Sequence, residues 1–179
     1  MNNNIPVYEP YFIGNEKKYV NQCLDSNWIS SKGEFINKFE TKFASYIKVK
    51  HATTVSNGTV ALHLALMALS IRKGDEVILP TLSYIASANS VKYVGAKPVF
   101  VDSEKGSWNI DPKKIEARIT SKTKAIMAVH LYGAICNVKE LKKICEKNNL
   151  YLIEDVAEGF GTKYNNKYAG TFGDVSTFS

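Results

Sequence analysis

A short polar stretch ahead of an Ala- and Leu-rich segment has the residue types of an anion site. Ser56-Asn57-Gly58-Thr59 follows the β-rich run 51–55. Gly58 would let a ligand approach the backbone, and the free N–H groups of a first helical turn attract negative charge. We therefore expect Gly58 and Thr59 to bind a phosphate. One alternative stays open, that the hydroxyl groups simply cap the helix. Asn57-Gly58-Thr59 is also a glycosylation sequon, but a chain without a signal peptide would not meet that machinery.

Two further candidates follow other β-rich runs. Tyr84 comes shortly after the run 76–79 and could stack on a planar ring, the alternative being a core or hinge tyrosine. Asp155 ends the apolar run 150–154. A buried, unpaired carboxylate is costly, so a cationic ring nitrogen would be a fitting partner for Asp155. A helix cap or a structural ion pair would satisfy it as well.

Two more polar residues complete the set. Glu158 lies three residues beyond Asp155, and Ala157 leaves room between them for something flat. Ser179 supplies another hydroxyl after the last β-rich run. A phosphate cradle, an aromatic ring, an acid and a second hydroxyl together suit pyridoxal 5'-phosphate (PLP), which has a phosphate, a flat ring and a pyridine nitrogen.

These residues can meet only if the strands that precede them end at one edge of a sheet. Short apolar runs alternate with amphipathic segments, which predicts an α/β three-layer sandwich with a mostly parallel sheet. Ligands of such sheets bind at the carboxyl ends of the strands. Asn165 and Asn166 predict a tight hairpin turn. The expected strands are 51–55, 76–79, 98–101, 125–129, 150–154 and 174–178, and the expected helices are 15–26, 34–46, 59–70, 83–94, 111–119 and 138–147.

Composition narrows the class of protein. The 179 residues can bury one sizeable core, and the net charge of +6 comes from scattered lysines without a basic stripe, which argues against nucleic-acid binding. Cys23, Cys136 and Cys145 lack metal-site spacing, so we expect buried free thiols and no metal. Residues 1–10 show no signal peptide, and no run reaches the ~18 apolar residues of a membrane span. We expect a cytoplasmic protein without a membrane partner.

The chain resembles the sugar aminotransferases of the DegT/DnrJ/EryC1/StrS family, which have the fold-type-I PLP aminotransferase architecture. Within that family it is most similar to the GDP-perosamine synthases. The resemblance spans nearly the whole chain. It rests on NWISSKGEFINKFE (27–40), SNGTVALHLAL (56–66), GDEVILPTLSYIASANSV (74–91), AIMAVHLYG (125–133), LIEDVAEGFGTKY (152–164) and GTFGDVSTFS (170–179).

The resemblance implies a role for each residue of the expected cofactor site. Gly58 and Thr59 match the backbone that holds the PLP phosphate, and Ser179 matches a serine that touches it. Tyr84 matches the aromatic ring stacked on the cofactor. Asp155 matches the acid paired with the pyridinium.

The remaining matches lie around this set. Glu158 matches a polar residue near the ring hydroxyl, and His130, in the HLYG stretch, is interpreted as structural. Trp28, Ser30 and Lys32 lie in the segment that approaches the site in family dimers and is expected to bind substrate. By resemblance the substrate is GDP-4-keto-6-deoxymannose, the amino donor is glutamate and the assembly is a homodimer serving surface-polysaccharide (O-antigen) synthesis.

The family's catalytic residue is a lysine five positions after the serine at 179, which forms a Schiff base with the cofactor. The sequence ends at Ser179. We therefore expect residues 1–179 to comprise an N-terminal segment and most of the PLP-binding large domain, without the C-terminal small domain, and to be inactive alone. Lys163 and Lys167 flank the expected hairpin turn and are not substitutes.

Three alternatives to an aminotransferase remain. The first is a PLP-dependent sugar dehydratase of the same family, in which histidine replaces the lysine. The second is a non-catalytic binding module or an inactive fragment. The third, a dinucleotide-binding protein, is disfavoured because no GxGxxG motif follows any expected strand.

Overall fold

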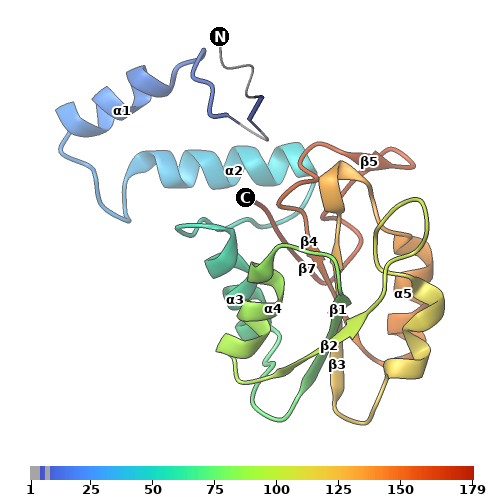
Figure 1. The fold of residues 1–179 in the computed structure, drawn as a ribbon. Helices are drawn as coiled ribbons and strands as arrows, with labels where there is room; N and C mark the ends of the chain where they lie inside the picture. Colours follow the sequence, from blue (N-terminus) through green and yellow to red (C-terminus); the bar gives the residue numbers. More distant parts are fainter. Residues whose placement is uncertain (1–4, 7–8) are drawn as a thin grey trace.

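A five-stranded parallel sheet forms the centre of the molecule (Figure 1). The computed structural model describes residues 5–6 and 9–179, so the stretch 1–10 lies partly outside the described residues. The strand order is β2-β1-β3-β4-β7, and each neighbouring pair is parallel. The strands are β1 (Glu76–Pro80), β2 (Lys97–Val101), β3 (Thr123–Val129), β4 (Tyr151–Asp155) and β7 (Val175–Thr177).

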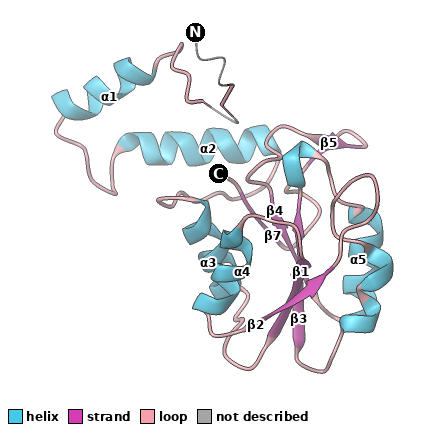
Figure 2. Ribbon diagram, viewed as in Figure 1, coloured by secondary structure: helices cyan, strands magenta, loops and turns pink. Residues whose placement is uncertain are grey.

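Helices cover the sheet on both faces. Helices α3 (Gly58–Ala68) and α4 (Ile85–Tyr93) pack on one face and α5 (Val138–Asn148) packs on the other (Figures 1 and 2). The prediction of an α/β three-layer sandwich with a mostly parallel sheet is confirmed. Such burial on both faces is what the near-continuous apolar strands require.

The two faces of the sheet build two cores. Side chains alternate along a strand, so Met127 of β3 joins the core under α3 and α4, while its neighbour Ile126 joins the core under α5. Both side chains are 0% exposed. The alternation also means that neighbouring polar residues at the end of a strand face different layers.

An N-terminal arm precedes this sandwich. Helix α1 (Glu16–Asp25) buries none of its described residues, and α2 (Glu34–Ile47) crosses above the carboxyl ends of the strands (Figure 1). Phe43 attaches α2 to the sandwich, since its ring lies 4.9 Å from that of Phe178 and 5.8 Å from that of Phe160. The expectation of three buried thiols is wrong for Cys23, which is half-buried on α1, whereas Cys136 and Cys145 are buried.

The expected strand 51–55 is absent. In the described part of the chain this segment pairs with no other strand and is mostly exposed. The N–H and hydroxyl groups of Thr54 both donate to Glu40 Oε1 of α2, at 2.7 and 2.9 Å. β-branched residues favour a strand only where a neighbouring strand is available, and here a side chain takes that place.

The expected helix 111–119 consists of two separate 3-10 turns, Pro112–Lys114 and Glu116–Arg118. Short helices are marginal, and the backbone bonds here run from residue i to i−3, as from Ile115 to Pro112. Ile115 itself is fully buried in the core under α5. A third 3-10 turn, Leu131–Gly133, follows β3.

The expected hairpin turn is present. Strands β5 (Lys163–Tyr164) and β6 (Lys167–Tyr168) pair antiparallel around Asn165 and Asn166. These two residues have φ values of 49° and 63°, the left-handed conformation that asparagine tolerates.

Within the described residues, no helix combines the length and the apolar character needed to cross a lipid bilayer.

Truncating the core under α3 and α4 should destabilise the protein. We expect Met127→Ala to lower the free energy of unfolding by about 2–5 kcal/mol, because it leaves a cavity at the centre of the sheet. Urea titration followed by circular dichroism measures the change. The control is Met67→Ala on the outer side of α3, where the side chain is 58% exposed. Equal losses in the two variants would contradict the assigned core.

Candidate functional site

The carboxyl edge of the sheet brings together residues from distant parts of the chain. A Cβ atom placed on Gly58 would lie only 2.8 Å from Ser179 Cβ and 3.0 Å from Ser179 Oγ. Helix α3 also packs against β7, two residues before Ser179. Glycine is therefore required at position 58, because any larger residue would push Ser179 away. The first and last parts of the expected phosphate cradle lie side by side.

The N-terminus of α3 leaves two donors free. The cap is Asn57, whose side chain accepts from the N–H of Val60 at 3.0 Å, rather than Ser56 or Thr59. Among the described residues, the N–H groups of Gly58 and Thr59 meet no acceptor. These two donors lie at the positive end of the helix, next to Ser179, and suit an anion.

Asp155 is a buried acid at the end of β4. Its side chain accepts from Ser87 Oγ at 3.0 Å and from the N–H of Ala157 at 3.2 Å. Burial raises the pKa of Asp155 above its ordinary value, and these two hydrogen bonds oppose that rise. Within the described chain Asp155 forms no ion pair. The alternative of a structural ion pair therefore does not hold, and a cation would be a favourable partner.

A neighbouring polar group on this face has no hydrogen-bond partner among the described residues. The Thr177 hydroxyl is buried and has no hydrogen-bond partner among the described residues. Thr177 is the register partner of Asp155 in the neighbouring strand, so the two side chains project from the same face of the sheet. A buried unpartnered hydroxyl next to an uncompensated acid is typical of a ligand site rather than of a finished core.

Tyr84 and Glu158 are both exposed, but only for Glu158 does the described structure give a side-chain hydrogen bond. Tyr84 is the residue immediately before α4, and its side chain is 75% exposed, which rules out a core tyrosine. Glu158 is exposed and accepts from the N–H of Tyr132 at 2.6 Å. The structure therefore gives Glu158 a backbone partner in the 3-10 turn after β3.

The expected substrate residues lie elsewhere in this chain. Trp28, Ser30 and Lys32 are in the loop between α1 and α2, away from the strand ends (Figure 1). Trp28 and Lys32 line an open hollow of about 880 Å³ between these two helices. A single chain thus does not bring them to Asp155 or Ser179.

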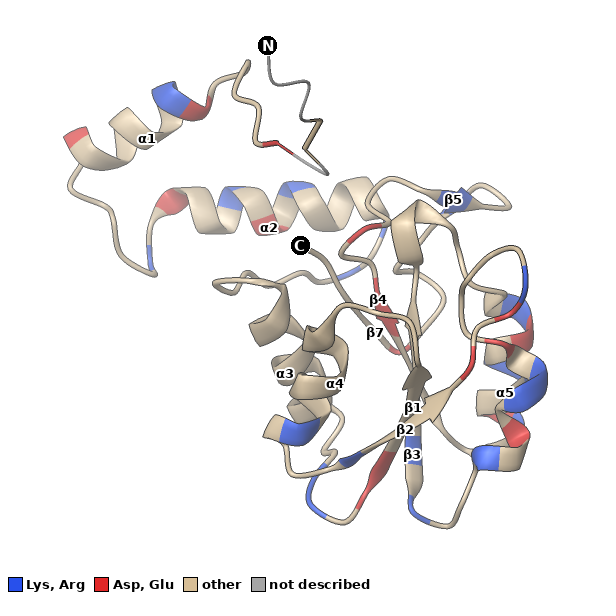
Figure 3. Ribbon diagram, in the orientation of Figure 1, with Lys and Arg blue, Asp and Glu red and all other residues tan. Residues whose placement is uncertain are grey.

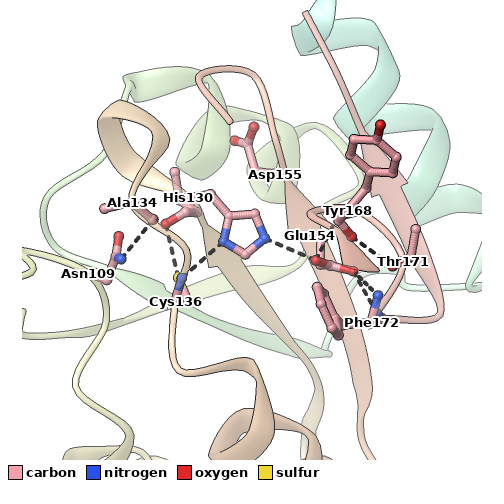
Figure 4. Close-up of polar contacts among 12 residues, drawn as sticks. Asn109, His130, Ala134, Cys136, Glu154, Asp155, Tyr168, Thr171 and Phe172 are labelled. Carbon is pink, nitrogen blue, oxygen red and sulfur yellow. Dashed lines mark hydrogen bonds and ion pairs between the residues drawn. The ribbon is translucent and has the colours of Figure 1, made fainter. Parts of the chain in front are cut away.

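Beside this edge lies a buried hydrogen-bond network centred on Glu154 (Figure 4). Glu154 Oε1 accepts from the N–H groups of Phe172 and Gly173, each at 2.7 Å. Glu154 Oε2 accepts from the N–H of Gly170 at 2.9 Å and from His130 Nε2 at 3.0 Å. The residue next to Asp155 in the sequence thus holds the loop that leads into β7.

The hydrogen bonds determine the protonation states in this network. His130 Nδ1 accepts from the N–H of Cys136, so the ring proton is on Nε2 and is donated to Glu154. Burial alone would raise the pKa of Glu154, but the bonds from His130, Gly170 and Gly173 outweigh it and hold the pKa below its ordinary value. The result is a neutral imidazole beside an ionised carboxylate, which fits the structural role expected for His130.

The buried thiols take no part in nucleophilic chemistry. Burial raises the pKa of Cys136 to about 12, and its Sγ donates to the carbonyl oxygen of Val129 at 3.1 Å. Burial likewise raises the pKa of Cys145 to about 12. Neither side chain is a thiolate at neutral pH, and the thiolate is the reactive form.

Comparison with known proteins decides the family. The model of the DegT/DnrJ/EryC1/StrS aminotransferase family matches residues 10–179. The chain belongs to this family. It is 62% identical to the GDP-perosamine synthase of Escherichia coli O157:H7 over 98% of its own length and 48% of that protein. The chain thus spans about half the length of the curated relatives it matches.

Two solved structures share the fold. A proposed sugar aminotransferase of Streptococcus pneumoniae, solved in its PLP form, superposes with a TM-score of 0.94 at 30% identity, covering 98% of this chain and 48% of that one. A GDP-4-keto-6-deoxymannose-3-dehydratase with bound GDP-perosamine superposes with a TM-score of 0.91 at 35% identity, covering 98% and 47%. Aminotransferases of this family use PLP, which confirms the expected cofactor.

The residues of this chain fit that cofactor. The free donors at Gly58 and Thr59 match a phosphate, and the uncompensated Asp155 carboxylate matches a protonated ring nitrogen. Sequence reasoning did not anticipate Ser87, Thr177 or Glu40 around this site. The spacing of Ser83 and Ser87, one helical turn apart, was the signal available for Ser87.

Removing the Glu154 charge should destabilise the protein. We expect Glu154→Gln to lower the free energy of unfolding by about 2–4 kcal/mol at pH 7, because an amide nitrogen would face backbone donors in place of an oxygen. The pKa of Glu154 is depressed in the folded state, so its stabilisation is present above the unfolded pKa of about 4.3 and is lost as the pH falls through the folded pKa. Urea titrations at pH 7 and pH 4 measure both effects.

The matched control for this variant is Glu140→Gln, since the Glu140 side chain is 45% exposed and pairs with Lys143. Surface pairs contribute little, so this change should stay within about 0.5 kcal/mol. A Glu154→Gln protein with unchanged stability at pH 7 would show that the network does not hold the loop before β7.

Proposed function

We propose that the protein is a PLP-dependent aminotransferase that moves an amino group from glutamate to carbon 4 of GDP-4-keto-6-deoxymannose, forming GDP-perosamine. The observation that carries the aminotransferase proposal is the buried Asp155 carboxylate, without an ion-pair partner among the described residues, at the edge where Gly58 meets Ser179. The substrate rests on the 62% identity with a GDP-perosamine synthase.

Each residue at the sheet edge has one task in this proposal. The N–H groups of Gly58 and Thr59 and the hydroxyl of Ser179 bind the phosphate of PLP. Tyr84 covers one side of the ring, and Glu158 lies near its hydroxyl. When bound, PLP supplies an electron sink next to the reacting amino nitrogen. Asp155 keeps the proton on the ring nitrogen.

Trp28, Ser30 and Lys32 bind the nucleotide sugar in this proposal, and they do so at the site of a second copy. Their loop lies away from the strand ends of its own chain, which supports a homodimer (Figure 1). The outer side of α3 supports it too, because the helix carries no charged residue and exposes Val60, Leu64 and Met67 (Figure 3). An exposed apolar surface of this kind favours association.

The cellular setting follows from the substrate. We place the protein in the cytoplasm, in surface-polysaccharide (O-antigen) synthesis. The three cysteines are free thiols, which is usual in a reducing compartment. Residues 1–179 correspond to the N-terminal segment and most of the PLP-binding large domain. By resemblance, the family's Schiff-base lysine lies five positions after Ser179.

The second candidate is a PLP-dependent dehydratase acting on the same sugar. The likeness to GDP-4-keto-6-deoxymannose-3-dehydratase supports it. That likeness is 35% identity, against 62% for the synthase, so the aminotransferase is favoured. The two reactions give different products, since one adds an amino group and the other eliminates a hydroxyl group.

Amino transfer tests the proposal directly. In a protein that carries the family's lysine five positions after Ser179, we expect glutamate, PLP and GDP-4-keto-6-deoxymannose to give GDP-perosamine and 2-oxoglutarate in equal amounts, measured by mass spectrometry and a coupled assay. Asp155→Asn should lower kcat/KM by at least about a hundredfold, because the ring nitrogen loses its anionic partner. Asp102→Asn, an exposed carboxylate paired with Lys114, is the control and should be fully active.

A deoxysugar product without nitrogen would favour the dehydratase. Preference for a dTDP- or UDP-linked ketosugar would refute the substrate and leave the aminotransferase class intact. Unchanged turnover of Asp155→Asn would refute the role of this acid.

The close approach of Gly58 to Ser179 gives a further prediction. Gly58→Ala should weaken PLP binding by about tenfold or more, because the added methyl group would displace Ser179 from the phosphate. Fluorescence titration with PLP measures the dissociation constant. Gly14→Ala is the control, since the added Cβ would meet only the end of the Glu16 side chain. Equal affinity in the two variants would place the phosphate elsewhere.

A further inference from the structure

Two serine hydroxyls lead from α4 to Asp155. Ser87, in the first turn of the helix, is 1% exposed, and its Oγ lies 3.0 Å from Asp155 Oδ2. Ser83, one turn earlier, places its Oγ 2.7 Å from Ser87 Oγ. The chain Ser83–Ser87–Asp155 therefore joins a half-buried hydroxyl to the buried acid.

The number of available protons fixes which hydroxyl donates and which accepts in the series Ser83–Ser87–Asp155. A serine hydroxyl has one proton to donate, and an ionised carboxylate can only accept. The Ser87 hydroxyl therefore donates its hydrogen bond to Asp155, and the Ser83 hydroxyl must donate to Ser87. A hydroxyl that itself accepts a hydrogen bond is a stronger donor, so Ser83 strengthens the bond to Asp155.

The hydrogen bond from Ser87 to Asp155 is important because no ion pair stabilises this carboxylate among the described residues. Burial favours the neutral acid, and among the described residues only Ser87 and the N–H of Ala157 donate hydrogen bonds to its oxygens. The titratable groups facing Asp155 are His130, which favours ionisation when protonated, and Glu158, which opposes it. His130 is held neutral by its bond from Cys136, and the facing part of α4 carries no charge. Hydrogen bonding is thus the main force that keeps Asp155 ionised.

We propose that Ser87, supported by Ser83, is a positioning residue that keeps the Asp155 carboxylate ionised and aimed at the cofactor's ring nitrogen, an inference that rests on the proposed function. Ser87 fixes Oδ2 from the helix side, while the N–H of Ala157 fixes Oδ1 from the loop side. The carboxyl plane is thereby set before any cofactor binds. Ser87 acts in this proposal through Asp155.

The first test measures the carboxyl group in the cofactor-free protein. Carbon-13 NMR of aspartate-labelled protein, with Asp155→Asn used to assign the signal, gives the pKa of Asp155. Removing a hydrogen bond from the ionised form raises the pKa of an acid, so Ser87→Ala should raise it by about one unit and Ser83→Ala by less. Ser87→Thr, which retains the hydroxyl, should restore the wild-type value.

The matched control is Ser90→Ala. Ser90 is 0% exposed on the same helix, and its hydroxyl donates to the backbone oxygen of Ser87 rather than to Asp155. It should leave the pKa of Asp155 unchanged. A pKa in Ser87→Ala equal to that of wild type, or equal shifts in Ser87→Ala and Ser90→Ala, would overturn the proposal. If Ser87→Ala does not fold, Ser83→Ala decides by the same criterion.

The second test measures PLP binding against pH. In Ser87→Ala the carboxyl group is protonated at higher pH, so affinity should begin to fall at higher pH than in wild type, about tenfold in the window between the two pKa values. An identical pH profile would overturn the proposal. A wild-type protein that does not bind PLP would refute the proposed function instead, and the NMR result would still decide the role of Ser87.

Discussion

The position of the loop that leads into β7 depends on the hydrogen bonds that the buried Glu154 carboxylate accepts. Glu154 is 0% exposed and receives hydrogen bonds from three backbone N–H groups of the segment 170–173 and from His130. A buried charge is tolerated only when it is fully satisfied, so the position of Glu154 fixes the loop that enters β7. Since β7 carries Thr177 and leads to Ser179, this structural anion sets one wall of the proposed cofactor site.

The neighbouring residue, Asp155, has the opposite state. Both acids end the same strand, but strand alternation sends Glu154 toward His130 and Asp155 toward α4 (Figure 4). Glu154 is satisfied by the protein, and its pKa is lowered. Asp155 is desolvated without an ion-pair partner in the described residues, and its pKa is raised. One acid of the pair stabilises the fold, while the other is left for a ligand.

The first turn of α3, which faces the end of β7 across the proposed cofactor site, depends on Gly58. Helix α3 begins at Gly58, and the missing side chain lets Ser179 come within contact distance of its first turn. Glu40 of α2 holds the preceding segment through Thr53 and Thr54. The N-terminal arm therefore contributes to the site from a distance, because it aims the segment that carries the free donors.

The sequence by itself determined the α/β class, the parallel sheet and the residues at its carboxyl edge. Apolar runs, turn asparagines and polar residues after strands are local patterns, and the edge rule follows from strand direction. The tertiary structure decided the features that depend on contacts between residues far apart in the sequence. The segment 51–55 is not a strand in the described chain, because Glu40 takes the place of a partner strand. Ser87 reaches Asp155 across 68 positions, and burial and hydrogen bonding with distant residues separate the pKa of Glu154 from that of Asp155.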